Sequence, residues 1–326
     1  MNEESFYKNK KVLVAGGTGT IGIPVVRQLV ERGAKVTVVS LDSPEFAASV
    51  LGPEITYKRD DLTKQENCKN AVEGQQMVFN LVGIKGSVGI GETKVASYLV
   101  PMLRFQTNLM EAAFNQDVER FLFVGSICSY PQADIHYEDN MWNGMPKQND
   151  RIPGIAKRIG ELLGEAYQLE YGWDAVRIVR PSNVYGPYDD FNPNTAQVIP
   201  ALIHRMVNGE NPVHVWGDGS AVRDFIFSED VAYWMLEAVE NAPAGLPLNL
   251  GNGQGITIKE VAETIARIVN TTPKIQWDVS KPSGDPCRTL AMDRAIEVIG
   301  YHTQTTLEEG IRKTVEWYCD QQNFFN

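Results

Sequence analysis

A glycine-rich turn near the N-terminus restricts the folds open to this chain of 326 residues. Residues 12–22 read VLVAGGTGTIG, and Gly16, Gly19 and Gly22 stand three residues apart between an apolar run and a helical pattern. Glycine lets the backbone turn tightly and approach a pyrophosphate, which the free amides of the following helix stabilise. The turn, with Thr20 and Ile21 before its last glycine, therefore predicts a dinucleotide-binding β-α-β unit.

The hydrophobic pattern repeats this unit along the first half of the chain. Short β-branched runs such as KVTVVSL, QMVFNLVG and RFLFVGS alternate with longer amphipathic stretches. This alternation predicts an α/β fold with a doubly wound parallel Rossmann sheet. We expect a dinucleotide-binding domain over residues 1–181. Loops rich in Pro, Asn and Gly then predict a smaller C-terminal substrate-binding lobe over residues 182–326, with some segments returning to the main domain.

Charge and cysteine usage exclude several classes of protein. A net charge of -11 repels phosphate backbones, and no basic patch predicts a nucleic-acid partner. The four cysteines show no CxxC or CxxH spacing, which argues against a metal site or a disulfide scaffold. No signal peptide and no run of about 20 apolar residues is visible, so we expect a soluble, cytoplasmic protein without a membrane partner.

The strands after the glycine turn carry the residues expected around the adenosine. Asp42 follows the second strand and would accept hydrogen bonds from both ribose hydroxyls, although Ser40 occupies the more usual position. No Lys or Arg between residues 40 and 50 would bind a 2'-phosphate, so we expect NAD rather than NADP. Asp61 and Leu62, after the third strand, are expected to border the adenine.

Four stretches in one order carry a family resemblance: the glycine turn, VGSICSYP, GIAK and RPSNVYGP. They resemble the extended short-chain dehydrogenase/reductase superfamily and, within it, the NAD-dependent epimerase/dehydratase family. The longer stretches RPSNVYGPYDDFNPNTAQVIPAL, VHVWGDGSAVRDF and DVSKPSGDPCRTLAMD are most similar to its GDP-L-fucose synthase branch. The resemblance covers nearly the whole chain and implies an enzyme that epimerises and reduces a GDP-4-keto-6-deoxy sugar.

The resemblance also implies residue roles, with two departures. Ser126 would lie beside the sugar 4-oxygen, Lys157 would bind the nicotinamide ribose, and Cys128 matches the cysteine used in epimerisation. The position of the catalytic tyrosine holds Pro153, and the histidine that partners the cysteine is replaced by Gln197. Two proton-transfer groups of the family are therefore missing.

Hydride transfer at C4 needs a proton at the adjacent oxygen, so another group has to supply it. His136 and Tyr137, in the segment between Ser126 and Lys157, are the expected replacements, whereas Tyr130 is assigned a structural role. Cys128 is either an active thiol or a buried, inert side chain.

Substrate recognition is expected from the second half of the chain. Arg223 and Arg288 match positions for a clamp on a nucleotide diphosphate, a role that suits the planar guanidinium group. Asn183 would contact the sugar, while Gln197 and Val198 lie in the segment expected to hold the base. The residues expected at the cofactor further include two at strand ends, Val82 and Pro181.

These residues predict an NAD-dependent oxidoreductase or epimerase that acts on a nucleotide-diphosphate sugar, a GDP-hexose or its 4-keto-6-deoxy derivative, at C4. The alternative is a catalytically degenerate protein that binds a nucleotide sugar or NAD in a regulatory or partner role. Pro153 and Gln197 are the observations that favour this alternative. The resemblance further implies a homodimer.

Overall fold

The structure is a computed structural model that describes residues 5–84, 95–281 and 284–325. Two residues of the stretch DVSKPSGDPCRTLAMD, Pro282 and Ser283, lie outside this range. Within the described part of the chain, no helix is long and apolar enough to cross a membrane.

A seven-stranded parallel sheet forms the centre of the molecule, with strand order β12-β7-β5-β4-β1-β2-β3. Its strands are β1 (Lys11–Ala15), β2 (Lys35–Ser40), β3 (Thr56–Arg59), β4 (Met77–Asn80), β5 (Arg120–Val124), β7 (Val176–Pro181) and β12 (Pro247–Leu250). The strand order reverses between β1 and β4, because β2 and β3 are added on one side of β1, and β4 and the later strands on its other side. This reversal is the point where open α/β sheets bind ligands. The predicted doubly wound Rossmann fold is confirmed.

Helices cover both faces of this sheet, and alternate strand residues pack against each layer. Val12 and Val14 belong to the core beneath one layer, while Leu13 and Ala15 belong to the core beneath the other. The first layer consists of α1 (Gly22–Glu31), α8 (Ser228–Asn241) and α10 (Asp293–Ile299). The second consists of α3 (Gln65–Val72), α5 (Val95–Asn115) and α6 (Arg151–Tyr171). The short helix α2 (Pro44–Val50) follows β2. Burial of both faces explains why the strands are apolar throughout.

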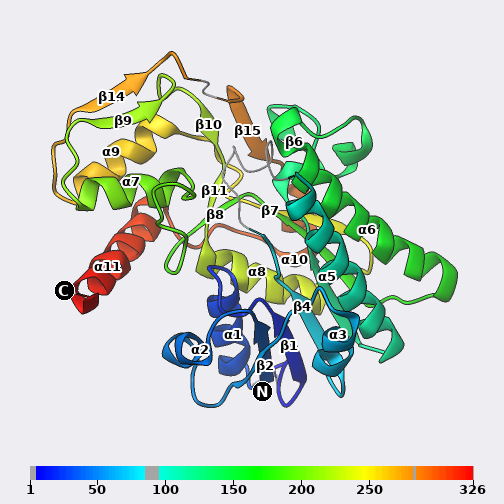
Figure 1. Cartoon of the computed structure of the whole chain (residues 1–326). Coiled ribbons are helices and arrows are strands. Elements are labelled where there is room, and N and C mark those ends of the chain that lie inside the picture. The colour runs from blue at the N-terminus through cyan, green and yellow to red at the C-terminus, as the bar shows by residue number, and fades with distance from the viewer. Residues whose placement is uncertain (1–4, 85–94, 282–283, 326) are drawn as a thin grey trace.

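The C-terminal lobe has its own core, and Figure 1 shows it on the opposite side of the molecule from α5 and α6. Its helices are α7 (Val198–Val207), α9 (Ile258–Ile268) and α11 (Leu307–Phe325). Two pairs of parallel strands accompany them: β8 (Asn183–Tyr185) with β11 (Phe225–Phe227), and β9 (Val213–Trp216) with β14 (Ile275–Asp278).

A small four-stranded sheet joins segments from both halves of the chain, in the order β13-β10-β15-β6. It consists of β6 (Ile135–His136), β10 (Val222–Arg223), β13 (Ile256–Thr257) and β15 (Cys287–Leu290). A short 3-10 helix, η1 (Ile127–Ser129), precedes β6. Two further 3-10 helices, η2 (Glu138–Trp142) and η3 (Gln148–Asp150), follow β6. Because β6 pairs with β15, the segment after β5 and the second half of the chain share one sheet.

Candidate active site

The glycine turn lies at the carboxyl end of β1, at the point where the strand order reverses. A Cβ atom on Gly22 would lie 2.3 Å from the Gly16 carbonyl oxygen, so only glycine allows α1 to begin this close to the turn. Gly16 in turn packs against the end of β4, where the backbone of Leu81 and Val82 passes. The turn, the start of α1 and Val82 therefore lie together at the carboxyl end of β1. The pyrophosphate and the nicotinamide of a dinucleotide are expected at this position.

Thr20 connects the glycine turn to the segment after β8. Its side chain is buried, and its hydroxyl donates a hydrogen bond of 3.0 Å to the Tyr188 carbonyl. The Tyr188 ring lies 4.8 Å from the ring of Trp317 in α11. Gly19 and Ile21 flank Thr20 at the start of α1, where the Gly19 carbonyl accepts the first helical hydrogen bond. The turn is thus held from the side of the lobe.

The end of β2 places a carboxylate where an adenosine ribose is expected. Asp42 accepts hydrogen bonds from Thr18 Oγ1 at 2.5 Å and from Ser40 Oγ at 3.4 Å. The sequence analysis missed Arg59, the last residue of β3, whose Nε donates to the Leu41 carbonyl at 3.0 Å. Arg59 is the register partner of Ser40, so the pairing of β2 with β3 brings it here, and no pattern within one segment predicts this contact.

Asp61 and Leu62 follow β3 as expected, and both take part in local structure. Asp61 Oδ1 accepts hydrogen bonds from the Thr63 hydroxyl at 2.7 Å and from the Thr63 amide at 2.9 Å. These two bonds hold the pKa of the Asp61 carboxyl below its usual value. Leu62 is buried in the core between α3 and the sheet. Their role at an adenine stays a prediction.

Ser126 and Lys157 converge on the carboxyl end of β5. Ser126 precedes η1 and its Oγ accepts the Cys128 amide at 3.1 Å. Lys157, in the second turn of α6, donates from Nζ to the Val124 carbonyl at 2.8 Å. Burial lowers the pKa of Lys157 to about 8, and the neighbouring Glu161 and Cys128 act in the opposite direction.

The position of the missing acid is occupied by a helix start. Pro153 is the third residue of α6. The first four amides of a helix have no intrahelical acceptor, so a proline here removes no helical hydrogen bond. Of the two expected replacements, His136 is buried and stacks on Tyr130 with ring centroids 4.9 Å apart. Burial lowers the pKa of His136 to about 4, so the ring is neutral at neutral pH. Tyr137, with 49% of its surface exposed, lies at the outside of the fold.

Arg223 and Arg288 are neighbours, because they are register partners on β10 and β15. Arg223 Nη1 donates to the Asp285 carbonyl at 2.7 Å, and Arg288 Nη1 lies 2.7 Å from Asp150 Oδ2. The sequence analysis missed Lys147, whose Nζ lies 2.7 Å from Asp285 Oδ1. Two guanidinium groups and one ammonium group therefore lie together with Asp150 and Asp285, and guanidinium groups are suited to a diphosphate.

The remaining residues expected at the substrate lie on the lobe side. Asn183, on β8, donates from Nδ2 to the Asp224 carbonyl at 2.7 Å. Gln197 is exposed immediately before α7, and Val198 is the first residue of that helix. Pro181 ends β7, two residues before Asn183. Within the described residues, no group of three or more His, Cys, Asp or Glu side chains could hold a metal ion.

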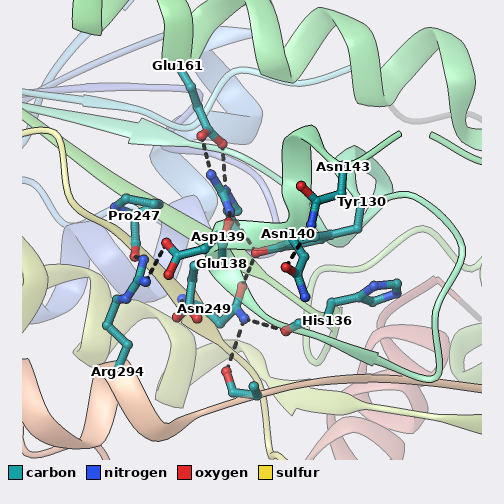
Figure 2. A network of polar contacts seen from close by, with 12 residues as sticks. Tyr130, His136, Glu138, Asp139, Asn140, Asn143, Glu161, Pro247, Asn249 and Arg294 are labelled. Carbon is teal, nitrogen blue, oxygen red and sulfur yellow. Dashed lines mark hydrogen bonds and ion pairs between the residues drawn. The ribbon is translucent and has the colours of Figure 1, made fainter. Parts of the chain in front are cut away.

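A buried polar network supports the site from behind, as Figure 2 shows. Arg180 of β7 donates to both Glu161 carboxylate oxygens, from Nε at 2.9 Å and from Nη2 at 2.6 Å. Arg180 Nη1 also donates to the Tyr130 hydroxyl at 2.8 Å, and that hydroxyl donates to Asn249 Oδ1 at 2.6 Å. Asn249 Nδ2 donates to the His136 carbonyl at 2.9 Å. The network joins α6, the segment after β5, β7 and β12.

Comparison with known proteins identifies the family of this site. The model of the NAD dependent epimerase/dehydratase family matches residues 12–251, which include the glycine turn, Ser126, Lys157 and Arg223. The chain belongs to this family. The family resemblance seen in the sequence is thus confirmed, while the assignment of Pro153 to the tyrosine position stays a prediction.

Relatives of this family member cover nearly its full length. GDP-L-fucose synthase 1 of Arabidopsis thaliana is 31% identical over 319 residues, which span 95% of this chain and 94% of the relative. GDP-L-fucose synthase of Escherichia coli is 30% identical and covers 97% of this chain and 98% of its own. Among solved structures, the UDP-glucose 4-epimerase of Thermotoga maritima with UDP-glucose aligns with a TM-score of 0.85 at 26% identity, over 96% and 99% of the two chains.

The buried ion pair generates the first prediction. Glu161→Gln keeps the shape of the side chain but leaves the Arg180 guanidinium without its counter-charge. Both side chains are almost fully buried, at 6% and 3% exposure, so we expect a loss of about 3–5 kcal/mol in the free energy of unfolding. Chemical denaturation measures it. Glu263→Gln, in an exposed ion pair with Lys259, is the matched control and should change stability by less than about 0.5 kcal/mol. Equal losses in the two variants would contradict this assignment.

Proposed function

We propose that this chain is an NAD-dependent oxidoreductase or epimerase that acts on a nucleotide sugar, a GDP-hexose or its 4-keto-6-deoxy derivative, at C4. The observation that carries the proposal is the placement of the segment that carries Ser126. Lys157, expected at the nicotinamide ribose, donates from Nζ to the Val124 carbonyl at 2.8 Å, and Arg288, expected at the diphosphate, donates from Nη2 to the Ile127 carbonyl at 2.9 Å. A hexose bound between these two groups would present its reacting carbon to Ser126.

Each side chain has a distinct part in this proposal. The cofactor, when bound, supplies the hydride donor or acceptor. Lys157 holds the nicotinamide ribose through its ammonium group, and Ser126 Oγ donates a hydrogen bond to the C4 oxygen, where negative charge develops during reduction. Arg223 and Arg288 neutralise the diphosphate and so hold the hexose in a fixed orientation. These side chains bind and orient the cofactor and the substrate. None of these roles supplies the proton that the C4 oxygen needs.

The choice of a GDP-sugar rests on the relatives. Those with 30% identity or more and nearly complete coverage are named GDP-L-fucose synthases, whereas the structural relative at 26% identity carries UDP-glucose. Guanine and uracil differ in size and in their hydrogen-bonding edges, so the segment around Gln197 and Val198 has to distinguish them. The proposal favours guanine because the stretch NTAQVIPAL resembles the GDP-L-fucose synthase branch and the GDP-L-fucose synthases match nearly the whole chain.

A panel of nucleotide sugars tests the proposal. The protein is incubated with GDP- and UDP-hexoses and their 4-keto-6-deoxy forms, with NAD or NADH, and absorbance at 340 nm and product chromatography are followed. We expect turnover with a GDP-sugar. The catalytically degenerate alternative is not favoured by the relatives, which are named as synthases; it predicts instead that ligands raise the melting temperature without being converted. Binding without turnover across the panel would therefore reject the enzyme and support that alternative.

We further propose NAD as the cofactor in preference to NADP. The Asp42 carboxylate, oriented by Thr18, accepts hydrogen bonds from a ribose diol and repels a 2'-phosphate. Arg59, at the end of the neighbouring strand β3, donates to the Leu41 carbonyl, so a positive charge also lies near the end of β2 and would favour a 2'-phosphate.

Asp42→Asn tests this cofactor preference. Removal of the negative charge should shift the ratio of kcat/KM for NADH over NADPH by about tenfold or more toward NADPH, because like-charge repulsion is lost. Steady-state kinetics with both cofactors measures the ratio. Glu54→Gln, an exposed carboxylate before β3 at its amino end, is the matched control and should leave the ratio unchanged. A wild-type preference for NADPH would contradict the proposal.

We also propose a homodimer formed through α5 and α6. Three apolar side chains at helical spacing on α6 are exposed, Ile159 by 39%, Leu162 by 50% and Leu169 by 80%. Light scattering should give a mass of about twice the 36.3 kDa of one chain. Leu162→Glu should shift the protein toward the monomer, while Val279→Glu, at a still more exposed apolar position in the lobe, should leave the mass unchanged. A monomeric wild type would contradict the proposal.

A further inference from the structure

A thiol, a carboxylate and a guanidinium group lie close together next to Ser126. The Asp150 carboxylate is an electrostatic neighbour of the Cys128 thiol, and Arg288 connects this carboxylate to the segment that carries the cysteine. Asp150 Oδ2 lies 2.7 Å from Arg288 Nη1, and Arg288 Nη2 donates to the Ile127 carbonyl at 2.9 Å. Arg288 is therefore bonded both to the carboxylate and to the backbone of η1, and it fixes the distance between them.

The start of α6 brings Asp150 to the thiol. Asp150 is the residue immediately before α6, three positions before Pro153. A Cβ atom on Gly154 would lie 2.2 Å from the Cys128 carbonyl oxygen, so the glycine allows the first turn of α6 to pack directly on η1. The carboxylate thus lies close to where α6 would otherwise present a tyrosine.

Charged and titratable groups from four elements surround the Cys128 sulfur. They are Asp150 before α6, Arg288 of β15, Lys157 of α6 and Tyr98 of α5. Burial raises the pKa of the thiol, and the Asp150 charge raises it further, while Arg288 lowers it. The thiol therefore keeps its proton at neutral pH, as a proton donor has to.

We propose that Cys128 is the general acid at the sugar C4 oxygen, and that Asp150, held by Arg288, returns the proton to its sulfur. The proposal rests on the function proposed above and supplies the proton that Pro153 cannot. Asp150 acts through Cys128 and is a positioning and relay residue.

The proton balance of this step is complete. In the reducing direction, a bound nicotinamide cofactor would supply the hydride that bonds to C4, and the carbonyl π electrons would move to the oxygen. The S–H bond of Cys128 then breaks as the O–H bond forms, which leaves a thiolate that the Arg288 and Lys157 charges stabilise. A proton from water returns to the sulfur through the Asp150 carboxylate. An alkoxide is a much stronger base than a thiolate, so the transfer is favourable even from a thiol of raised pKa.

The other titratable groups are less suited to this role. His136 is neutral and its ring is stacked on Tyr130 within the core. Tyr137 is about half exposed, and burial raises the pKa of Tyr98 to about 12. Each can be removed separately, so the experiment distinguishes them from Cys128.

Single-turnover oxidation of NADH with the nucleotide sugar that the wild type converts is the first test. Cys128→Ala should lower the rate constant about 100-fold or more while the dissociation constant of the sugar nucleotide stays unchanged, because a general acid contributes about 10² to 10⁴-fold. Cys319→Ala, at a half-buried cysteine of α11, is the matched control and should react at the wild-type rate. A Cys128→Ala protein that keeps its rate, with the loss appearing in Tyr98→Phe, His136→Asn or Tyr137→Phe, would overturn the proposal.

Thiol alkylation tests the role of Asp150 without substrate. Asp150→Asn removes a negative charge beside the sulfur, which lowers the pKa of Cys128 and should accelerate its alkylation by iodoacetamide at pH 8, followed by peptide mass spectrometry. Asp139→Asn, in the separate ion pair with Arg294, should leave the Cys128 rate unchanged. One limb of the pH–rate profile should reflect the titration of the Cys128 thiol. In turnover, Asp150→Asn should shift this limb to lower pH, an effect that a purely structural role does not produce. Unchanged alkylation and an unchanged pH profile would overturn the relay.

The tests separate the failure of this inference from that of the function beneath it. A wild type that converts no nucleotide sugar overturns both. A wild type that turns over together with an equally fast Cys128→Ala variant overturns the proton relay alone.

Discussion

The paired charges of Arg180 and Glu161 connect the elements on which the candidate site is built. The arginine is on β7 and the glutamate is one turn after Lys157 on α6, so their two hydrogen bonds fix the lysine helix against the sheet. The same guanidinium reaches Tyr130, which belongs to the segment that carries Ser126. Because both charges are buried, each has to keep its hydrogen-bonding partners. This requirement fixes the relative positions of α6, β7 and the segment that carries Ser126.

The fold could be predicted from the sequence because it depends on local patterns. Apolar runs of strand length, amphipathic helices and the glycine turn are each visible within a few residues, and the parallel sheet follows from their alternation. The pairing of Arg223 with Arg288 was accessible only through the family resemblance. Arg59 and Lys147 were missed for a physical reason: each reaches its neighbours through contacts between segments far apart in the sequence, which no local pattern records.

Asp150 illustrates the same limit at the site itself. In the sequence it is one polar residue of a loop that ends before a helix, and it acquires a partner only because Gly154 lets α6 pack on η1. The sequence resemblance predicted a proline at the tyrosine position, while the ion pair of Asp150 with Arg288 is visible only in three dimensions. A contact of this kind joins segments far apart in the chain, so no local pattern predicts it.

The contact between Thr20 and the Tyr188 carbonyl links the glycine turn to the lobe. Tyr188 packs on Trp317 of α11, so the segment that contacts the turn is anchored in the lobe. The shape of the glycine turn therefore depends on the last helix of the chain, and α1 and α11 are connected through one hydrogen bond and one aromatic contact.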